Sequence, residues 1–224
     1  MRPDPDEKQW REYIAQNYRS ANYGRGLPGW IMRKGHRELE RNFPRETRFE
    51  KVLEVGAGEG IHVPFVRHGF TEYILTDRDA GALKRIKGPV FPGVLFQTTD
   101  ACELSFPDRS FDRVIATHVL EHLPEPHLVL QEWRRVLKPG GVLSLLLPCD
   151  PGLAWRIARS FGPRARAGAN GIDYDYWMAR EHINPIYNLL SFIRYYFEVR
   201  TEKFLPFGLP FADINLLYAC NLSA

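Results

Sequence analysis

Apolar residues near the start of the chain recur with the spacing of a helix. Four positions between residues 10 and 18 follow the i, i+3, i+4, i+8 pattern that gathers side chains on one helical face. They are Trp10, Tyr13, Ile14 and Tyr18. The segment GRGLPG (24–29) breaks this helix, and the pattern predicts a second helix from Trp30 to about Phe43. Because both helices precede the first strand, we expect residues 1–45 to form an N-terminal helical flap.

Short apolar runs alternate with helical stretches from residue 49 to residue 148. The predicted strands are FEKVLEV (49–55), EYILTDR (72–78), VLFQTTD (94–100), FDRVIATH (111–118) and GVLSLLLP (141–148). Helices are expected at GIHVPFVRHG (60–69), at DAGALKRIK (79–87) and at 126–137, the last closed by KPGG. Strands this rich in Val, Ile and Leu are typical of parallel sheets covered on both faces. The pattern therefore predicts a doubly wound α/β sheet with ligands at the carboxyl ends of its strands.

The regular alternation stops after Pro148. Residues 149–184 contain no strand pattern, so we expect a lid insertion on the ligand side of the sheet. A helix is predicted next, with Asn184 as its N-cap and Pro185 as its first residue. Two late strands, 198–205 and 214–222, are separated by PFGLPFAD and allow a hairpin. The chain is then a single domain whose seven-stranded sheet is mostly parallel, with one antiparallel strand.

The segment KVLEVGAGEG (51–60) ends the first strand in three glycines. Their spacing is GxGxG rather than the GxGxxG of dinucleotide sites, and Glu54 would repel a pyrophosphate but suit an amino group. A glycine turn between a strand and a helix brings backbone amides close to a ligand. Asp77 ends the next strand, where a carboxylate can accept ribose hydroxyls, and Asp100 ends the third, where it would meet an adenine amine. These positions predict a pocket for an adenosine that carries an amino-acid tail.

Four motifs in this region resemble those of the class I S-adenosylmethionine-dependent methyltransferases, of the small-molecule, Methyltransferase-11-like type. They are VLEVGAGEG, YILTDRD, TTDACELSFPDRSFDRVIATHVLEHL and EWRRVLKPGGVLSLLLP. The resemblance covers residues 50–148 and resumes at the last helix and strand pair. It implies a Rossmann-like fold, S-adenosylmethionine as cofactor and S-adenosylhomocysteine as product.

The resemblance also implies which residues bind the cofactor. Those expected on its methionine side are Glu54, Gly56, Ala57, Gly58 and Thr117, and those on its adenosine side are Asp77, Arg78, Asp100 and Ala101. Glu54 would meet the amino group, Asp77 the ribose hydroxyls and Asp100 the adenine, which Arg78 would flank. Asp79 is expected to cap the following helix rather than to bind the ligand.

Methyl transfer to a hydroxyl group usually needs a general base, and histidine is the commonest one near neutral pH. His118 ends the strand at 111–118 and is expected to point toward the transferred methyl group. His182 lies at the end of the lid insertion, within reach of a substrate pocket. Both histidines are candidate catalytic residues. His122, in LEHLPEP, is expected to be structural, because family members of many specificities resemble this segment.

Substrate specificity is expected to reside in the lid insertion and the flap. The stretch 153–168 places Leu153, Ile157 and Phe161 on one helical face. Its arginines suit three interpretations, namely a solvated lid, recognition of a substrate phosphate or carboxylate, and contact with anionic lipid. These arginines are Arg156, Arg159, Arg164 and Arg166. The loop DYDYWMAREH (173–182) suits sugars or cyclic substrates as well as ordinary packing. Candidates to close over the cofactor are Tyr13, Tyr18 and Tyr23.

Composition narrows the choice of partners and location. The 224 residues carry a formal net charge of +3, which is less basic than nucleic-acid binders usually are. The three cysteines, Cys102, Cys149 and Cys220, form no CxxC pair or Cys/His cluster, so the sequence predicts neither a disulfide nor a metal site. The longest apolar run, 142–147, is too short to span a bilayer. We expect a cytoplasmic protein with a small-molecule substrate, anionic or sugar-containing, no nucleic-acid partner and room for peripheral membrane contact.

The favoured function is methylation of a small molecule, by O-methylation of a saccharide, a polysaccharide precursor or a secondary metabolite. The segment THVLEH lacks an Asn-Pro-Pro-Tyr-type signature, which disfavours N-methylation of adenine or of glutamine amides. Two alternatives stay open: a quinone or lipid methyltransferase at a membrane surface, and a regulatory subunit that binds S-adenosylmethionine without turnover. The glycine spacing disfavours an NAD-dependent oxidoreductase.

Overall fold

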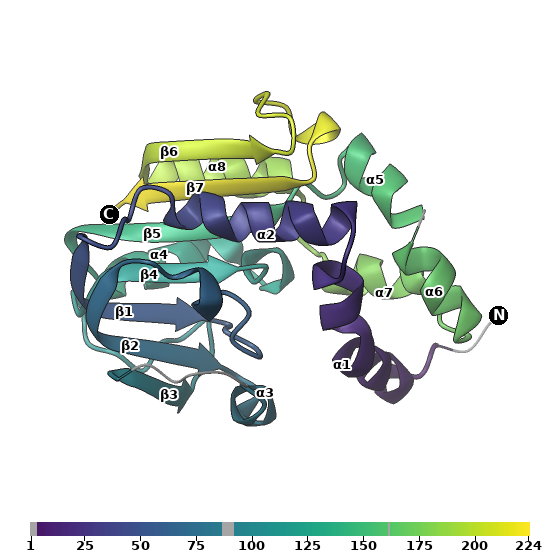
Figure 1. The fold of residues 1–224 in the computed structure, drawn as a ribbon, viewed down its shortest axis with the longest axis horizontal. Helices are drawn as coiled ribbons and strands as arrows, with labels where there is room; N and C mark the ends of the chain where they lie inside the picture. Colours follow the sequence, from purple (N-terminus) through teal and green to yellow (C-terminus); the bar gives the residue numbers. More distant parts are fainter. Residues whose placement is uncertain (1–3, 87–91, 161) are drawn as a thin grey trace.

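The computed structural model describes residues 4–86, 92–160 and 162–224 and centres on a seven-stranded sheet. The strands are β1 Arg48–Val55, β2 Gly69–Asp77, β3 Val94–Thr98, β4 Phe111–Thr117, β5 Leu137–Pro148, β6 Glu198–Leu205 and β7 Leu217–Ser223. They lie in the order β3-β2-β1-β4-β5-β7-β6 (Figure 1). Neighbouring strands are parallel except β7, which is antiparallel to both β5 and β6. The predicted doubly wound α/β fold with one antiparallel strand is therefore confirmed.

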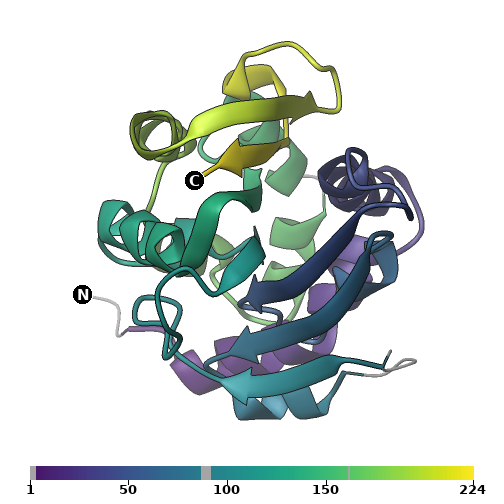
Figure 2. The ribbon, with the colours of Figure 1, turned by 90° about the vertical axis from the view of Figure 1, so that its left-hand side faces the viewer.

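Helices cover both faces of the sheet. They are α1 Glu7–Tyr23, α2 Leu27–Glu40, α3 Ala80–Lys84, α4 Pro126–Val136, α5 Leu153–Ser160, α6 Pro163–Ala169, α7 Tyr174–Glu181 and α8 Ile186–Tyr196. Three 3₁₀ turns are η1 Val63–Phe65, η2 Leu120–His122 and η3 Ala212–Ile214. Figure 2 shows α2 on one side of the sheet and α4 with α8 on the other. Among the described residues, no helix has the length and apolar character needed to cross a membrane.

The hydrophobic core has one large cluster on one face of the sheet and two smaller clusters on the other face. Trp133 of α4 and Ile193 of α8 are fully buried in the larger cluster. On the opposite face, Leu39 of α2 packs with Leu146 of β5 and Leu217 of β7, all of them fully buried. Complete burial of an aliphatic side chain contributes about 1.5–3 kcal/mol to folding. The helix α2 therefore forms a layer of the sheet domain.

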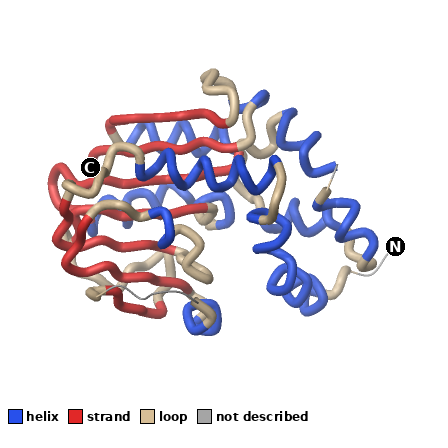
Figure 3. The backbone as a smooth tube through the Cα atoms, viewed as in Figure 1, coloured by secondary structure: helices blue, strands red, loops and turns tan. Residues whose placement is uncertain are grey.

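The helix α1 extends beyond the carboxyl ends of the strands and lies beside the lid helices α6 and α7 (Figure 3). Trp10 of α1 stacks on Trp177 of α7, with ring centroids 5.6 Å apart and planes inclined by 1°. Ala167 and Ile172 complete this small buried cluster. The indole N–H of Trp10 also donates to Glu181 Oε1 at 3.2 Å. The helices α1, α6 and α7 are thus packed together beyond the carboxyl ends of the strands.

The prediction of a helix at 60–69 is wrong. Within this fully described stretch, Val63–Phe65 forms a single 3₁₀ turn, and Gly69 already belongs to β2. His62 Nε2 lies 3.1 Å from Glu40 Oε1, and His68 Nε2 lies 3.9 Å from Glu40 Oε2. Because one carboxylate of α2 holds both histidines, the segment stays a tight loop, and no side chain caps its start. The glycine turn is therefore not followed by a helix that aims its N-terminus at a ligand.

Several other helix and strand boundaries also differ from the prediction. Pro185, not Asn184, is the N-cap of α8, because the Asn184 amide donates to the carbonyls of Leu120 and Leu123 at 3.0 and 2.7 Å. The strand β5 starts at Leu137, so KPGG continues the strand instead of closing α4. Strand β3 ends at Thr98 and α2 spans 27–40, each somewhat earlier than predicted. Phe161 and Lys87 lie outside the described residues.

Candidate functional site

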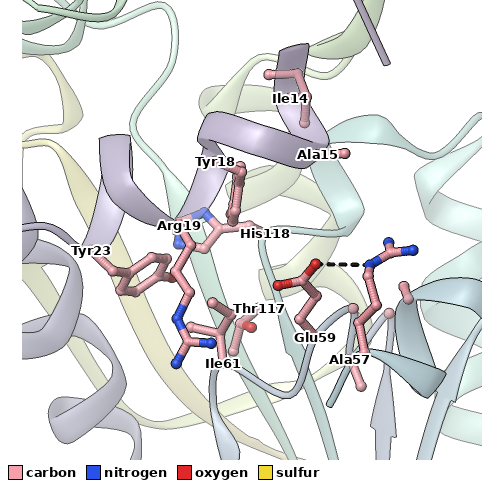
Figure 4. Close-up of a pocket in the computed structure, with 14 residues that line it drawn as sticks. Ile14, Ala15, Tyr18, Arg19, Tyr23, Ala57, Glu59, Ile61, Thr117 and His118 are labelled. Atoms are coloured by element: carbon pink, nitrogen blue, oxygen red, sulfur yellow. Dashed lines mark hydrogen bonds and ion pairs between the residues drawn. The ribbon is translucent and has the colours of Figure 1, made fainter. Parts of the chain in front are cut away.

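A cavity of about 250 Å³ opens at the carboxyl ends of β1 and β4, against α1 (Figure 4). Of the residues singled out from the sequence, those that line it are Gly56, Ala57, Gly58, Thr117 and His118. Tyr18 and Tyr23 of α1 line the same cavity, whereas Tyr13 packs with Trp10 in the lid cluster. The structure therefore brings the glycine turn, the end of β4 and two of the three flap tyrosines to one hollow.

The glycine turn needs its glycines at two positions for different reasons. Gly56 has φ +65°, and a Cβ there would lie 2.5 Å from Val119 Cγ2, too close for any side chain. Gly58 has φ +54°, but a Cβ there would meet no atom within 4 Å. Space is therefore restricted at Gly56 by the loop after β4, while the backbone at Gly58 faces the open cavity.

Asp77 holds the glycine turn in place from the end of β2. Its Oδ2 accepts a hydrogen bond from the Gly58 amide at 2.9 Å, and its Oδ1 accepts one from the Asp79 amide at 2.8 Å. Asp79 in turn accepts from the Gly81 amide at 2.7 Å, which confirms its predicted role as the N-cap of α3. The Asp77 carboxylate thus joins the first two strand ends and lies behind the turn rather than in the cavity wall.

Glu54 is buried below the turn, with 1% of its surface exposed. The hydroxyl of Tyr73 donates to its Oε2 at 2.6 Å. Burial raises the pKa of the Glu54 carboxyl above its ordinary value. Glu54 does not line the cavity, so its contact with an amino group of the ligand stays a prediction.

The residues expected around the adenine lie outside this cavity. Arg78 lines a second cavity of about 240 Å³ together with His122 and Arg180. Asp100 Oδ1 accepts from the Cys102 amide at 2.8 Å, and the Ala101 carbonyl accepts from the indole N–H of Trp133 at 2.9 Å. Asp100 and Ala101 therefore shape the turn after β3, and their contacts with adenine stay predictions.

The two candidate catalytic histidines lie in different surroundings. His118 lines the cavity and has a left-handed backbone with φ 57°, which few non-glycine residues adopt. Its Nδ1 lies 3.6 Å from Glu121 Oε1. His182 is not part of the cavity wall; its Nδ1 lies 2.8 Å from Asp150 Oδ2, and its ring faces that of Trp155. Geometry at the cavity thus favours His118 over His182.

Sequence reasoning missed a buried chain of polar side chains that starts at the cavity. Tyr23 Oη lies 2.7 Å from His36 Nε2, and His36 Nδ1 lies 2.9 Å from His62 Nδ1. His62 Nε2 lies 3.1 Å from Glu40 Oε1, which Arg113 Nη1 approaches to 2.7 Å. Beyond Tyr23, these side chains are at most 1% exposed. The signal in the sequence was a pair of charged residues inside apolar patterns, Glu40 and Arg113.

Within this buried row of polar side chains, Glu40 and Arg113 form an ion pair. Burial alone would raise the pKa of Glu40, but the Arg113 guanidinium, together with His62 and His68, lowers it to about 2. Burial, reinforced by neighbouring imidazoles, holds the pKa of His36 well below its ordinary value. Burial also lowers the pKa of His68 to about 4. At neutral pH Glu40 is therefore ionised, and His36 and His68 are neutral.

Known proteins match the central part of the chain. A family model described as "Methyltransferase domain" matches residues 53–145. The chain is 33% identical over 116 residues to 27-O-demethylrifamycin SV methyltransferase of Amycolatopsis mediterranei, which covers 46% of this chain and 42% of that protein. It is 34% identical over 108 residues to phosphatidylethanolamine N-methyltransferase of Cereibacter sphaeroides, which covers 45% and 51%. The chain thus spans about half the length of these relatives.

The fold also matches solved structures. N-methyltransferase NodS of Bradyrhizobium japonicum WM9, solved in complex with S-adenosyl-L-homocysteine, superposes with a TM-score of 0.60 at 15% identity over 86% of this chain and 87% of that one. At this identity the likeness shows the fold. The residues that the family model matches include the glycine turn, Thr117 and His118. Residues 53–145 are therefore similar to a methyltransferase domain, and the chain shares the fold of a solved methyltransferase.

Proposed function

We propose that this protein transfers a methyl group from S-adenosylmethionine to a hydroxyl of a small molecule, such as a saccharide, a polysaccharide precursor or a secondary metabolite. The observation that carries the proposal is that the glycine turn, Thr117 and His118 line the same cavity. The relative from Amycolatopsis mediterranei, by its name a methyltransferase of a 27-O-demethylated rifamycin, supports oxygen as the acceptor atom.

The chain's own residues suit this reaction. S-adenosylmethionine supplies an electrophilic methyl group on a sulfonium. With that donor bound, His118 would take the proton of the acceptor hydroxyl as its oxygen gains the methyl group, and the sulfur would keep the electron pair of the broken carbon–sulfur bond and leave as S-adenosylhomocysteine. Tyr18 and Tyr23 border the cavity from α1 and help to exclude water from it. Holding the two reactants in line lowers such a barrier by about 7–11 kcal/mol in favourable cases.

Calorimetry tests the cofactor. We expect S-adenosylmethionine and S-adenosylhomocysteine to bind, and NAD not to bind. Replacing Asp77 with alanine should weaken binding at least tenfold, about 1.4 kcal/mol, because the Gly58 and Asp79 amides lose their acceptor. Asp108→Ala is the control, since that carboxylate is exposed and pairs with Arg135 instead. Binding of NAD alone, or an unchanged affinity in Asp77→Ala, would contradict the proposal.

A second candidate, methylation of a lipid or quinone at a membrane surface, is favoured by an exposed apolar patch. Leu153 and Ile157 of α5 are 57% and 49% exposed. The loop between β6 and β7 exposes Phe207, Leu209 and Phe211 by 68%, 52% and 60%. Beside this loop in Figure 1, α5 packs against η3. Apolar side chains next to arginines suit the surface of an anionic bilayer, and one relative is by name a phosphatidylethanolamine N-methyltransferase.

Vesicle sedimentation tests the second candidate. The protein should sediment with vesicles containing phosphatidylglycerol and be released by salt, because the arginine contribution is screened. Phe207→Ser/Phe211→Ser should reduce the bound fraction several-fold, since each exposed ring would lose its place among the acyl chains. Tyr195→Ser, an 81% exposed aromatic on α8, is the matched control. If the double variant and the control sediment alike, the patch does not bind lipid.

A further inference from the structure

Three metal-binding side chains converge between η2 and the end of the lid. One ligand atom from each of Glu121, His122 and His182 lies within 4.8 Å of the others. Glu121 and His122 belong to η2, just after β4, while His182 follows α7. The group differs from the residues that line the cavity at the glycine turn. It therefore needs an explanation of its own.

Both histidines are already oriented through one ring nitrogen. His122 Nδ1 lies 2.8 Å from the Glu181 carbonyl oxygen, and His182 Nδ1 lies 2.8 Å from Asp150 Oδ2. An imidazole that donates from Nδ1 to a carbonyl or carboxylate presents Nε2 as the acceptor. Metal-binding histidines are held in this way in most proteins. The nitrogen left available on each ring is therefore Nε2.

Glu121 supplies the second, independent observation. Its side chain is 1% exposed, and among the described residues neither carboxylate oxygen has a hydrogen-bond partner. The nearest cationic candidates are His118 Nδ1 at 3.6 Å and His122 Nε2 at 3.8 Å from Oε1. A buried carboxylate without hydrogen bonds is strongly unfavourable. A cation held between Glu121 and the two imidazoles would remove that cost.

We propose that Glu121, His122 and His182 bind one divalent transition-metal ion. Two imidazoles and one carboxylate favour Zn²⁺ or a neighbour such as Co²⁺ or Ni²⁺ over Mg²⁺ or Ca²⁺, which prefer oxygen ligands. Ligand atoms about 2.0–2.2 Å from one ion lie about 3–3.5 Å apart, so the three side chains close in by roughly an ångström. The ion would tie the lid to the end of β4.

The site goes beyond the proposed methyl transfer, because it binds metal whether or not the acceptor is a hydroxyl. Three protein ligands leave at least one coordination position open. His122 also lines the second cavity, whose wall carries arginines as well as the carboxylates of Glu7 and Glu181.

Titration with Co²⁺ tests the site directly. The untagged, metal-free full chain should take up one equivalent of Co²⁺ and develop a visible d–d absorption band, which one equivalent of Zn²⁺ abolishes. Glu121→Gln and His182→Ala should each weaken Co²⁺ binding at least 100-fold. Asp150→Asn should weaken it about 10- to 100-fold, because Asp150 orients His182.

His127→Ala is the matched control, a histidine of α4 that contacts Glu125 rather than the cluster. It should keep the Co²⁺ affinity of the unchanged protein. Circular dichroism and S-adenosylmethionine binding report whether each variant is folded, and the conclusion uses the folded ones. The proposal would be overturned if the protein without substitutions developed no stoichiometric Co²⁺ band. So would a folded His182→Ala or Asp150→Asn that binds Co²⁺ as tightly as His127→Ala.

Discussion

Replacing Glu40 with glutamine is expected to lower the free energy of unfolding at pH 7 by about 3–5 kcal/mol, the usual cost of breaking a buried ion pair. The carboxylate and the Arg113 guanidinium are 2.7 Å apart, and both side chains are 0% exposed. Glutamine would leave Arg113 charged and buried, and it would also remove the acceptor for His62. Urea unfolding followed by fluorescence measures the loss.

The pH dependence separates this charge from simple packing. The pKa of Glu40 is lowered from 4.5 to about 2 in the folded state. A depressed carboxyl pKa stabilises the fold at every pH above the unfolded value, and that stability is lost as the pH falls toward the folded value. The difference in stability between the unchanged protein and Glu40→Gln should therefore be constant above about pH 5.5. It should shrink by up to about 3 kcal/mol as the pH falls from 4.5 toward 2.

Two control variants test whether the buried ion pair accounts for the loss of stability. Glu38→Gln, on the same helix, breaks a surface pair with Arg41 and should cost at most about 1 kcal/mol. Glu40→Leu combined with Arg113→Met should lose less than the sum of its single variants, because no unpaired charge remains buried. A Glu40→Gln loss as small as that of Glu38→Gln, with the same value at every pH, would show that the pair does not stabilise the fold.

Most of the sheet could be predicted because its strands are specified locally. Runs such as EYILTDR and GVLSLLLP are apolar enough to identify buried parallel strands without knowledge of their neighbours. Asp79 could be identified as a cap for the same reason, since it bonds an amide two residues away. These features depend on residues close together in the sequence, and the prediction needed nothing else.

The features that were missed depend on contacts between distant segments. The loop at 60–69 differs from its predicted helix because His62 Nε2 lies 3.1 Å from Glu40 Oε1 of α2 and His68 packs beside the same carboxylate. Arg113 is a charged residue within an apolar strand, and its partners come from two other elements. They are Glu40 and the Leu39 carbonyl of α2, the latter at 3.5 Å, and Ser144 Oγ of β5 at 3.0 Å. A sequence pattern cannot place such partners, because only the folded topology brings them together.

The candidate site shows the same division. The glycine turn, Thr117 and His118 could be brought to one edge from the rule that ligands bind at the carboxyl ends of parallel strands. The tyrosines of α1 could only be offered as a group, because the angle at which α1 crosses that edge follows from its packing on the lid through Trp10 and Trp177. The proximity of Glu121 to His182 could likewise not be predicted, since His182 lies about sixty residues further along the chain.

His118→Asn is expected to reduce methyl transfer by about 10²–10⁴-fold, the usual contribution of a general base. His118 directly follows β4 at the cavity, where its amide donates to the Leu146 carbonyl at 2.8 Å. Among the described residues its buried Nε2 has no hydrogen-bond partner. A left-handed backbone at φ 57° that persists in a non-glycine residue often marks a functional position. Asparagine tolerates this backbone better than alanine does, so the variant removes the base with little added strain.

The measurement is transfer of a labelled methyl group from S-adenosylmethionine to acceptors in fractionated cell extract, alongside calorimetry of the cofactor. Turnover should fall in His118→Asn while cofactor affinity changes no more than a few-fold, because a proton acceptor acts on the attacking hydroxyl and not on the bound cofactor. His127→Ala should match the unchanged protein in both measurements. Equal turnover in His118→Asn would exclude this histidine as the base. Tight cofactor binding without label transfer by the unchanged protein to any fraction would instead favour a regulatory subunit that binds S-adenosylmethionine without using it.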